Sequence, residues 1–129
     1  MPKRSLVSVV EDDQFFRESM ETLMRSLGYQ VEAFASAAEF LASPHFSETA
    51  CVIADVNMPV MTGVDLYRHL LSSDHSIPTI LVTAYADDDV GRRALKDGVI
   101  CYLRKPLDEN HLKQCLQAAL QRRDRPDDR

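Results

Sequence analysis

Hydrophobic positions follow two different periods along the chain, and the two periods alternate. Five short runs of mainly apolar residues predict β-strands over residues 6–10, 30–34, 50–54, 79–82 and 100–103. Between these runs, apolar residues recur at helical spacing and predict helices over residues 14–27, 37–42, 64–71 and 88–96, with a last helix after Asp108. Gly28 and Gly98 follow the first and fourth helical stretches, where helices commonly end on glycine.

Strands that alternate with helices across short loops predict a single parallel sheet with helices on both faces. Right-handed crossovers favour an open, doubly wound α/β sandwich of five strands, and 129 residues are too few for an eight-stranded barrel. We expect one domain over residues 1–121. Residues 122–129 contain no apolar side chain, so they indicate a polar tail or the start of a linker.

Composition and charge exclude several classes of protein. No apolar run approaches the ~20 residues of a membrane span, and the first residues do not resemble a secretory signal. The net charge of -5 disfavours direct contact between this domain and nucleic acid, which usually needs a basic face. Cys51, Cys101 and Cys115 lie in apolar surroundings. We expect all three to be reduced and buried in a cytoplasmic protein.

Residues able to carry chemistry lie just after four of the five predicted strands. In parallel sheets of this type, ligands bind beyond the carboxyl ends of the strands. Those positions hold the acids Glu11, Asp12 and Asp13, then Asp55 with Asn57, then Thr83, and finally Lys105. Taken alone, Asp13 can be a helix cap and Asp55 a turn residue. Their placement at one strand end after another favours a shared site instead.

The acids of this site predict a bound divalent cation. Several carboxylates at one point repel each other unless a cation joins them. Mg²⁺, or Mn²⁺ in its place, suits oxygen ligands of this kind. We expect Asp12 and Asp13 to hold it, together with one oxygen of Asp55 and the backbone carbonyl of Asn57.

The same residue types favour phosphoryl transfer. A carboxylate beside such an ion can act as a nucleophile toward phosphorus and form an acyl phosphate. Catalysis then consists mainly of positioning and of neutralising charge on the transferred oxygens. The ammonium of Lys105 and the hydroxyl of Thr83 are suited to bind those oxygens, and the small side chain of Ala84 leaves room for the group.

These residues resemble, in their order and spacing, the receiver domain of response regulators in bacterial two-component signalling. The matching segments are the acids at 11–13, the loop DVNMPVMTG at 55–63, the pair TA at 83–84 and the segment YLRKP at 102–106. The resemblance covers residues 4–121. It implies a flavodoxin-like (βα)5 fold with the strand order 2-1-3-4-5.

The resemblance also implies roles for individual residues. Asp55 would be the phosphoacceptor and Asp12 and Asp13 the metal pair, while Glu11 would be an adjacent acid that does not bind the metal. The family's lysine matches Lys105, and the peptide bond to the proline that follows it is typically cis.

A switch is implied as well. Thr83 and Tyr102 match a pair whose hydroxyl and ring move on phosphorylation, which remodels the face formed by the fourth helix, the fifth strand and the fifth helix. Asn57 and Tyr85 match positions that tune dephosphorylation in relatives.

A protein of this family receives its phosphoryl group from a histidine kinase or a phosphotransfer protein. It catalyses part of the transfer and its own slow dephosphorylation, but it is a switch and not a turnover enzyme. The resemblance favours control of a partner, of a homodimer, or of an attached helix-turn-helix domain that regulates transcription.

Two alternative functions stay open at this point. One is a protein-interaction module that works without phosphorylation. The other is an aspartate-nucleophile phosphatase of the haloacid dehalogenase type. In that family a second acid stands two residues after the nucleophile and acts as acid and base, and Asn57 occupies that place here.

Overall fold

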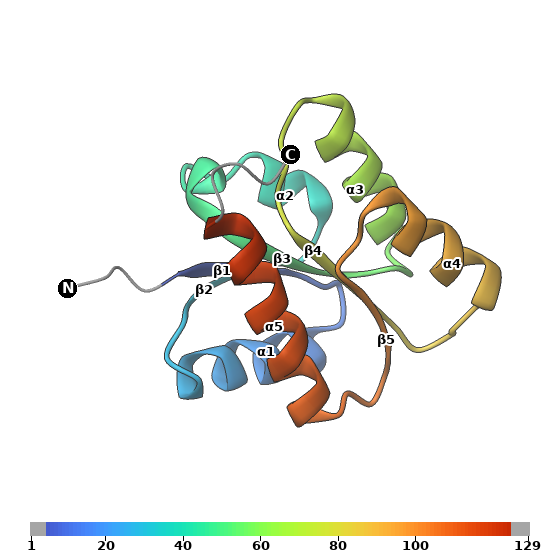
Figure 1. Cartoon of the computed structure of the whole chain (residues 1–129). Coiled ribbons are helices and arrows are strands. Elements are labelled where there is room, and N and C mark those ends of the chain that lie inside the picture. The colour runs from blue at the N-terminus through green and yellow to red at the C-terminus, as the bar shows by residue number, and fades with distance from the viewer. Residues whose placement is uncertain (1–4, 125–129) are drawn as a thin grey trace.

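The computed structural model describes the backbone of residues 5–124 and the side chains of residues 5–121. Five parallel strands form one sheet in the order β2-β1-β3-β4-β5, and helices cover both of its faces (Figure 1). The predicted doubly wound, flavodoxin-like sandwich and its strand order are therefore confirmed.

The elements follow one another across short connections. The strands are β1 Leu6–Val10, β2 Gln30–Phe34, β3 Thr49–Asp55, β4 Thr79–Thr83 and β5 Cys101–Arg104. The helices are α1 Gln14–Ser26, α2 Ala37–Leu41, α3 Gly63–Ser72, α4 Asp88–Asp97 and α5 Glu109–Asp124. A short 3-10 helix, η1 at Phe46–Glu48, lies where the sequence predicts no element.

The last helix runs past the expected domain boundary at residue 121, because α5 continues to Asp124. Residues 125–129 of the predicted tail lie outside the described residues. Across the described helices, none combines the length and the apolar character that a membrane crossing requires.

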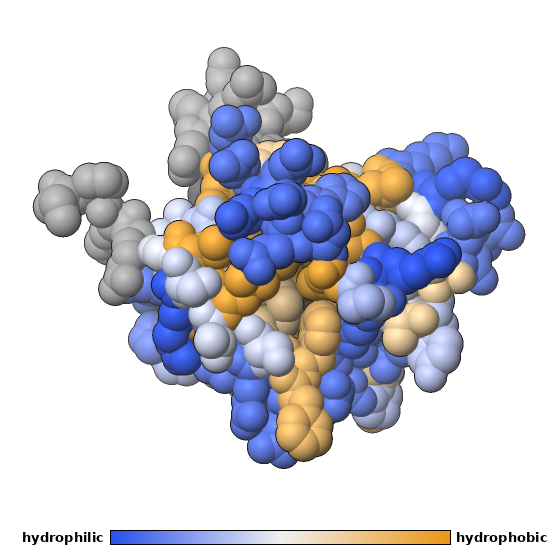
Figure 2. Space-filling model, turned by 90° about the horizontal axis from the view of Figure 1, so that it is seen from below, coloured by the Kyte–Doolittle hydropathy of each residue, from blue (hydrophilic) through white to orange (hydrophobic). Residues whose placement is uncertain are grey.

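Two apolar cores, one on each face of the sheet, hold the sandwich together. The first joins α1 and α5 to the sheet through fully buried side chains such as Met24, Leu112 and Leu116. The second joins α2, α3 and α4 to the opposite face through Phe40 and Leu66, among others. Seen from the side of α1 and α5, hydrophilic side chains cover much of the surface and apolar ones appear between them (Figure 2).

The register of the sheet brings the functional strand ends to one edge. Val10 at the end of β1 pairs with Ala54, and Asp55 at the end of β3 pairs with Val82. Because parallel strands end in the same direction, Glu11 follows β1 at the edge where Asp55 ends β3. The pairing therefore places residues that are far apart in the sequence side by side.

The predicted reduced state is wrong for two of the three cysteines, although Cys115 is buried as expected. Cys101 on β5 and Cys115 on α5 form a disulfide, with their Cα atoms 6.3 Å apart. Strand alternation explains the approach, because Cys101 and Leu103 both face the core that contains α5. Cys51 is free and buried as expected, and burial raises the pKa of its thiol to about 12.

We predict that reducing this disulfide lowers the free energy of unfolding by about 3 kcal/mol, because the bond closes a loop of about 15 residues in the unfolded chain. Urea titrations of the oxidised protein with and without a thiol reductant measure the change. The variant Cys115→Ser is the control, and the reductant should leave its stability unchanged. Three titratable thiols in the unreduced, unfolded protein would contradict the pairing.

Candidate functional site

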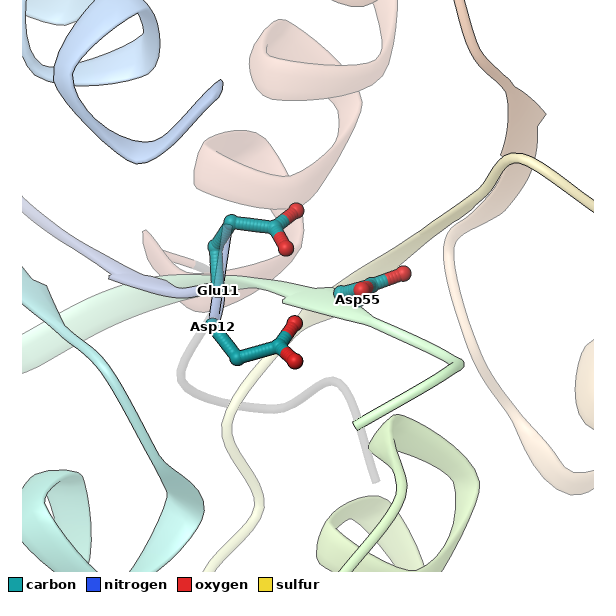
Figure 3. A group of neighbouring side chains, drawn as sticks. All are labelled: Glu11, Asp12 and Asp55. Atoms are coloured by element: carbon teal, nitrogen blue, oxygen red, sulfur yellow. The ribbon is translucent and has the colours of Figure 1, made fainter. Parts of the chain in front are cut away.

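Three carboxylates converge at the carboxyl edge of the sheet. One oxygen from each of Glu11, Asp12 and Asp55 lies within 4.8 Å of the others (Figure 3). Glu11 and Asp12 come from the loop after β1, and Asp55 is the last residue of β3. Asp12 is exposed, whereas Glu11 and Asp55 are only 1% and 5% exposed. Two of the three acids are thus buried close together, which is unfavourable unless something neutralises them.

One of the predicted ligands lies outside this cluster. The sequence predicts Asp13 beside Asp12 and Asp55, but the Asp13 carboxylate caps α1 by accepting the backbone N–H of Phe16 at 3.2 Å. The physical reason is that α1 begins at Gln14, so the residue before it serves as the N-cap. Glu11, expected to stand outside the metal site, takes the place of Asp13 in the cluster.

Lys105 supplies the positive charge that faces these acids. Its Nζ donates to Oε1 of Glu11 at 2.8 Å and lies 3.8 Å from Oδ1 of Asp55. The ammonium also lies over the ring of Phe16, 4.2 Å from the ring centroid. The peptide bond from Lys105 to Pro106 is cis, as the resemblance implies.

Glu11 is held by both of its carboxylate oxygens. Oε1 accepts from Lys105 and Oε2 accepts the backbone N–H of Asp13 at 3.0 Å. Burial nevertheless raises its pKa from the ordinary 4.5 to about 7, and the charge of Asp55 adds to the rise. The bonds from Lys105 and Asp13 oppose it. At Glu11, desolvation therefore outweighs the stabilising bonds from Lys105 and Asp13.

Asp55 is fixed in place by the start of α3. A β-carbon added to Gly63 would lie only 2.5 Å from the backbone oxygen of Asp55, so the helix can approach this closely only with glycine there. Thr62 and Asp65 form a capping box at the same end of α3. The backbone N–H of Asn57 donates to Oδ1 of Asp55 at 3.3 Å. The loop after β3 thus supports the carboxylate from its own backbone.

The hydroxyl of Thr83 is engaged away from Asp55. Thr83 is fully buried, donates to Oδ1 of Asn57 at 2.6 Å and accepts the backbone N–H of Tyr85 at 3.0 Å. The ring of Tyr85 is exposed, with 77% of its surface open to solvent. For Thr83 to bind a group carried by Asp55, its hydroxyl must first leave Asn57.

Tyr102 lies apart from the acids and contacts α4. Successive residues of β5 face opposite sides of the sheet, so Tyr102 packs against the core that contains α4 while Cys101 packs against the other. Its hydroxyl accepts the backbone N–H of Asp87 at 3.1 Å. The Asp87 carboxylate in turn caps α4 by accepting the N–H groups of Asp89 and Val90.

The structure therefore brings together Asp12, Asp55, Asn57, Thr83 and Lys105 as predicted, adds Glu11, and directs Asp13 elsewhere. The signal for Glu11 is its position directly after β1, at the carboxyl edge of the sheet. The cluster of Glu11, Asp12 and Asp55 offers hard oxygen ligands close together, which suits a divalent cation. Asn57 is an amide bonded to Thr83, so it is not the acid–base group that a dehalogenase-type phosphatase requires.

We predict that Glu11→Gln stabilises the metal-free protein at pH 8 and much less at pH 5. Because the folded pKa of Glu11 lies above its unfolded value, the unfolded chain binds fewer protons between pH 4.5 and about 7, and wild-type stability falls as pH rises through that window. The variant should gain roughly 1–3 kcal/mol at pH 8. Urea unfolding in the presence of a chelator measures it. A gain equal at both pH values would show that Glu11 does not titrate in this range.

Comparison with known proteins places the chain in a family. The family model of the response regulator receiver domain matches residues 7–117. The response regulator protein TodT of Pseudomonas putida is 35% identical over 118 residues, which cover 92% of this chain and 52% of TodT. The transcriptional regulatory protein FixJ of Bradyrhizobium diazoefficiens is 28% identical and is covered over 58% of its length by 93% of this chain.

Solved structures agree with these sequence relationships. A response regulator receiver protein from Burkholderia phymatum is 34% identical and superposes with a TM-score of 0.78 over 92% of this chain and 96% of that one. The chain spans about half the length of the curated relatives named above. With the family model matched over most of its length, the chain belongs to the response-regulator receiver domains of two-component signalling.

Proposed function

We propose that Asp55 accepts a phosphoryl group from a histidine kinase or a phosphotransfer protein. The observation that carries this proposal is the surroundings of Asp55. It is a buried carboxylate at the sheet edge, close to the ammonium of Lys105 and to two further acids. A buried, backbone-supported carboxylate presents one oxygen in a fixed direction, which favours in-line attack on phosphorus. Because the chain spans only part of its relatives, the donor protein is a proposal as well.

The metal of the reaction is proposed to be Mg²⁺, with Mn²⁺ as a substitute. Asp12, Asp55, Glu11 and the backbone carbonyl of Asn57 would hold it, in place of the set that included Asp13. When bound, the ion supplies neutralisation of the phosphoryl oxygens. The repulsion between Glu11 and Asp55, which helps to raise the pKa of Glu11, supports this assignment because an added cation would relieve it.

Lys105 and Thr83 are the proposed ligands of the transferred group. Lys105 already lies within 4 Å of both buried acids, so a short movement of its ammonium suffices to reach a group on Asp55. Thr83 would exchange its bond with Asn57 for a bond to a phosphoryl oxygen. Exposed Ala84, which follows Thr83, adds almost no side chain at the point where the group enters.

The output is proposed to pass through Tyr102 to the face formed by α4, β5 and α5. Movement of Thr83 displaces the β4–α4 loop, because its hydroxyl holds the N–H of Tyr85. That loop ends at Asp87, whose N–H is held by Tyr102. We propose that the remodelled face binds a partner, a second copy of the chain or an attached DNA-binding domain. The name of FixJ as a transcriptional regulator supports the last of these.

Dephosphorylation is proposed to depend on Asn57 and Tyr85, which flank the site from two loops. Asn57 accepts a hydrogen bond from the hydroxyl of Thr83. Tyr85 lies two residues after Thr83 and is exposed. Their side chains would control how water approaches a phosphorylated Asp55. The domain would then act as a switch that catalyses steps on itself.

We predict that acetyl phosphate adds one phosphoryl group to the wild-type protein only when Mg²⁺ is present, because the metal must offset the acids before an anionic donor can approach Asp55. Intact-mass analysis measures the addition. Asp55→Asn should gain none, while Asp65→Asn, a change in the nearby capping box of α3, should still be phosphorylated. If wild type gains nothing and also binds no beryllofluoride, the proposed function is wrong.

We predict that Asp12→Asn weakens Mg²⁺ binding at least tenfold, whereas Asp13→Asn changes it little. Both substitutions remove one negative charge from neighbouring positions, but only Asp12 belongs to the acidic cluster, and asparagine remains a good N-cap at position 13. Isothermal titration with MgCl₂ measures both affinities. An equal loss of Mg²⁺ affinity in the two variants would indicate that Asp13 is also a ligand and would contradict the proposed ligand set.

A further inference from the structure

A glycine in the first turn of α4 lies under the ring of Tyr102. Gly91 is buried, and its backbone N–H donates to the carbonyl of Asp87 at 2.9 Å in an ordinary helical bond. A β-carbon at this position would lie 2.8 Å from Cδ2 and 3.0 Å from Cε2 of Tyr102. Glycine within a helix is less stable than alanine. The close approach of the ring, and not the backbone conformation, therefore explains why glycine stands here.

The missing side chain allows Tyr102 to make its hydrogen bond. The hydroxyl accepts the N–H of Asp87 while the body of the ring lies over Gly91, so the ring spans the first turn of α4. At the other end of the β4–α4 loop, the hydroxyl of Thr83 accepts the N–H of Tyr85. The backbone of this loop is thus held at two points by the two hydroxyls to which we assign the switch.

We propose that Gly91 is a positioning residue that sets the resting place of Tyr102 and, through it, the balance between the resting and the phosphorylated arrangements. The inference rests on the proposed function, because that function assigns the switch to Thr83 and Tyr102. Without a β-carbon at position 91, the ring lies on α4 and the Asp87 N–H is bonded. A β-carbon there disfavours this place for the ring while leaving the cluster around Asp55 untouched. In the proposed switch, the ring leaves α4 when Asp55 is phosphorylated. A β-carbon at position 91 would therefore shift the population toward the phosphorylated arrangement.

The proposal predicts in which direction Gly91→Ala changes the affinity for a ligand of the phosphorylated arrangement. A ligand that favours one of two states binds more tightly when that state is more populated before binding. Beryllofluoride with Mg²⁺ mimics the phosphoryl group on Asp55 and is the probe for the phosphorylated arrangement. Gly91→Ala should therefore bind it more tightly than wild type, although position 91 touches neither Asp55 nor the acids.

The test uses the whole chain with 3-fluorotyrosine in place of tyrosine. Fluorine NMR follows the resonance of Tyr102, which is assigned by its disappearance in Tyr102→Phe. In Gly91→Ala without ligand, this resonance should move toward the position it takes in wild type with beryllofluoride and Mg²⁺. The dissociation constant for beryllofluoride, at fixed Mg²⁺, should fall by about tenfold. Lys96→Ala, which places alanine at an exposed site of α4, should change neither quantity.

Variants at position 102 test whether the effect of Gly91→Ala acts through the ring of Tyr102. In a Tyr102→Leu background the ring is absent, so adding Gly91→Ala should leave beryllofluoride affinity unchanged. If Gly91→Ala alone fails to fold, the pair Gly91→Ala and Tyr102→Leu should fold. A pair that also fails would show that the β-carbon collides with another part of the protein, and the inference would be wrong.

The outcomes distinguish this inference from the proposed function. Wild type that binds no beryllofluoride contradicts the proposed function itself. Wild type that binds it, with a folded Gly91→Ala whose Tyr102 resonance and affinity are unchanged, contradicts the inference alone. In that case the ring accommodates the β-carbon by a small shift on α4, and Gly91 does not position the switch.

Discussion

The burial of two carboxylates close together at the sheet edge governs the site. Glu11, Asp12 and Asp55 bring three carboxylates within 4.8 Å, and Lys105 supplies the ammonium that contacts the two buried ones. Burial makes this arrangement unfavourable enough to raise the pKa of Glu11 to about 7. The fold can hold the acids together because three parallel strands end at one edge, and the two apolar cores fix the spacing of those strands. A cation added between these acids would relieve their repulsion.

The same geometry connects the acids to the outer face of the domain. Asn57 lies next to the acids and holds the hydroxyl of Thr83, and Thr83 holds one end of the β4–α4 loop. Tyr102 holds the other end of that loop at Asp87. In the proposed function, a new negative group on Asp55 would draw Thr83 away from Asn57 and so move a loop whose far end carries α4. Such a switch would be a local change of charge that acts on the packing of the domain.

The sequence alone locates most of this site, and the reasons for its failures are specific. The order of apolar runs determines where strands end, so the pattern by itself is enough to place Asp55, Thr83 and Lys105 together. Strand prediction alone does not show which of the acids at 11–13 face Asp55, because the answer depends on the residue at which α1 begins. The backbone N–H of Phe16 donates to the Asp13 carboxylate, which identifies Asp13 as the N-cap of α1. An N-cap is a signal that the sequence does contain, and it is the competing interpretation of Asp13.

Other features depend on contacts between elements that local patterns do not encode. Alternation along β5 places Cys101 on the face toward α5, but the depth at which α5 packs decides whether Cys115 can reach it. Likewise, the sequence predicts a helix around Gly91 and a strand at Tyr102, but not that the ring lies on the glycine. The short helix η1 has no apolar periodicity of its own. Apart from η1 and the capping role of Asp13, the misses concern how two elements meet, whereas the elements themselves follow from the sequence.

The most direct test of the central claim is a crystal structure of the chain with Mn²⁺ and beryllofluoride, in which anomalous scattering locates the metal. We expect Mn²⁺ at the cluster of Glu11, Asp12 and Asp55 and a beryllofluoride group on Asp55. The ammonium of Lys105 should then bind that group instead of Glu11. A structure with the metal held by Asp13, or with Lys105 still paired to Glu11 beside an occupied Asp55, would contradict it.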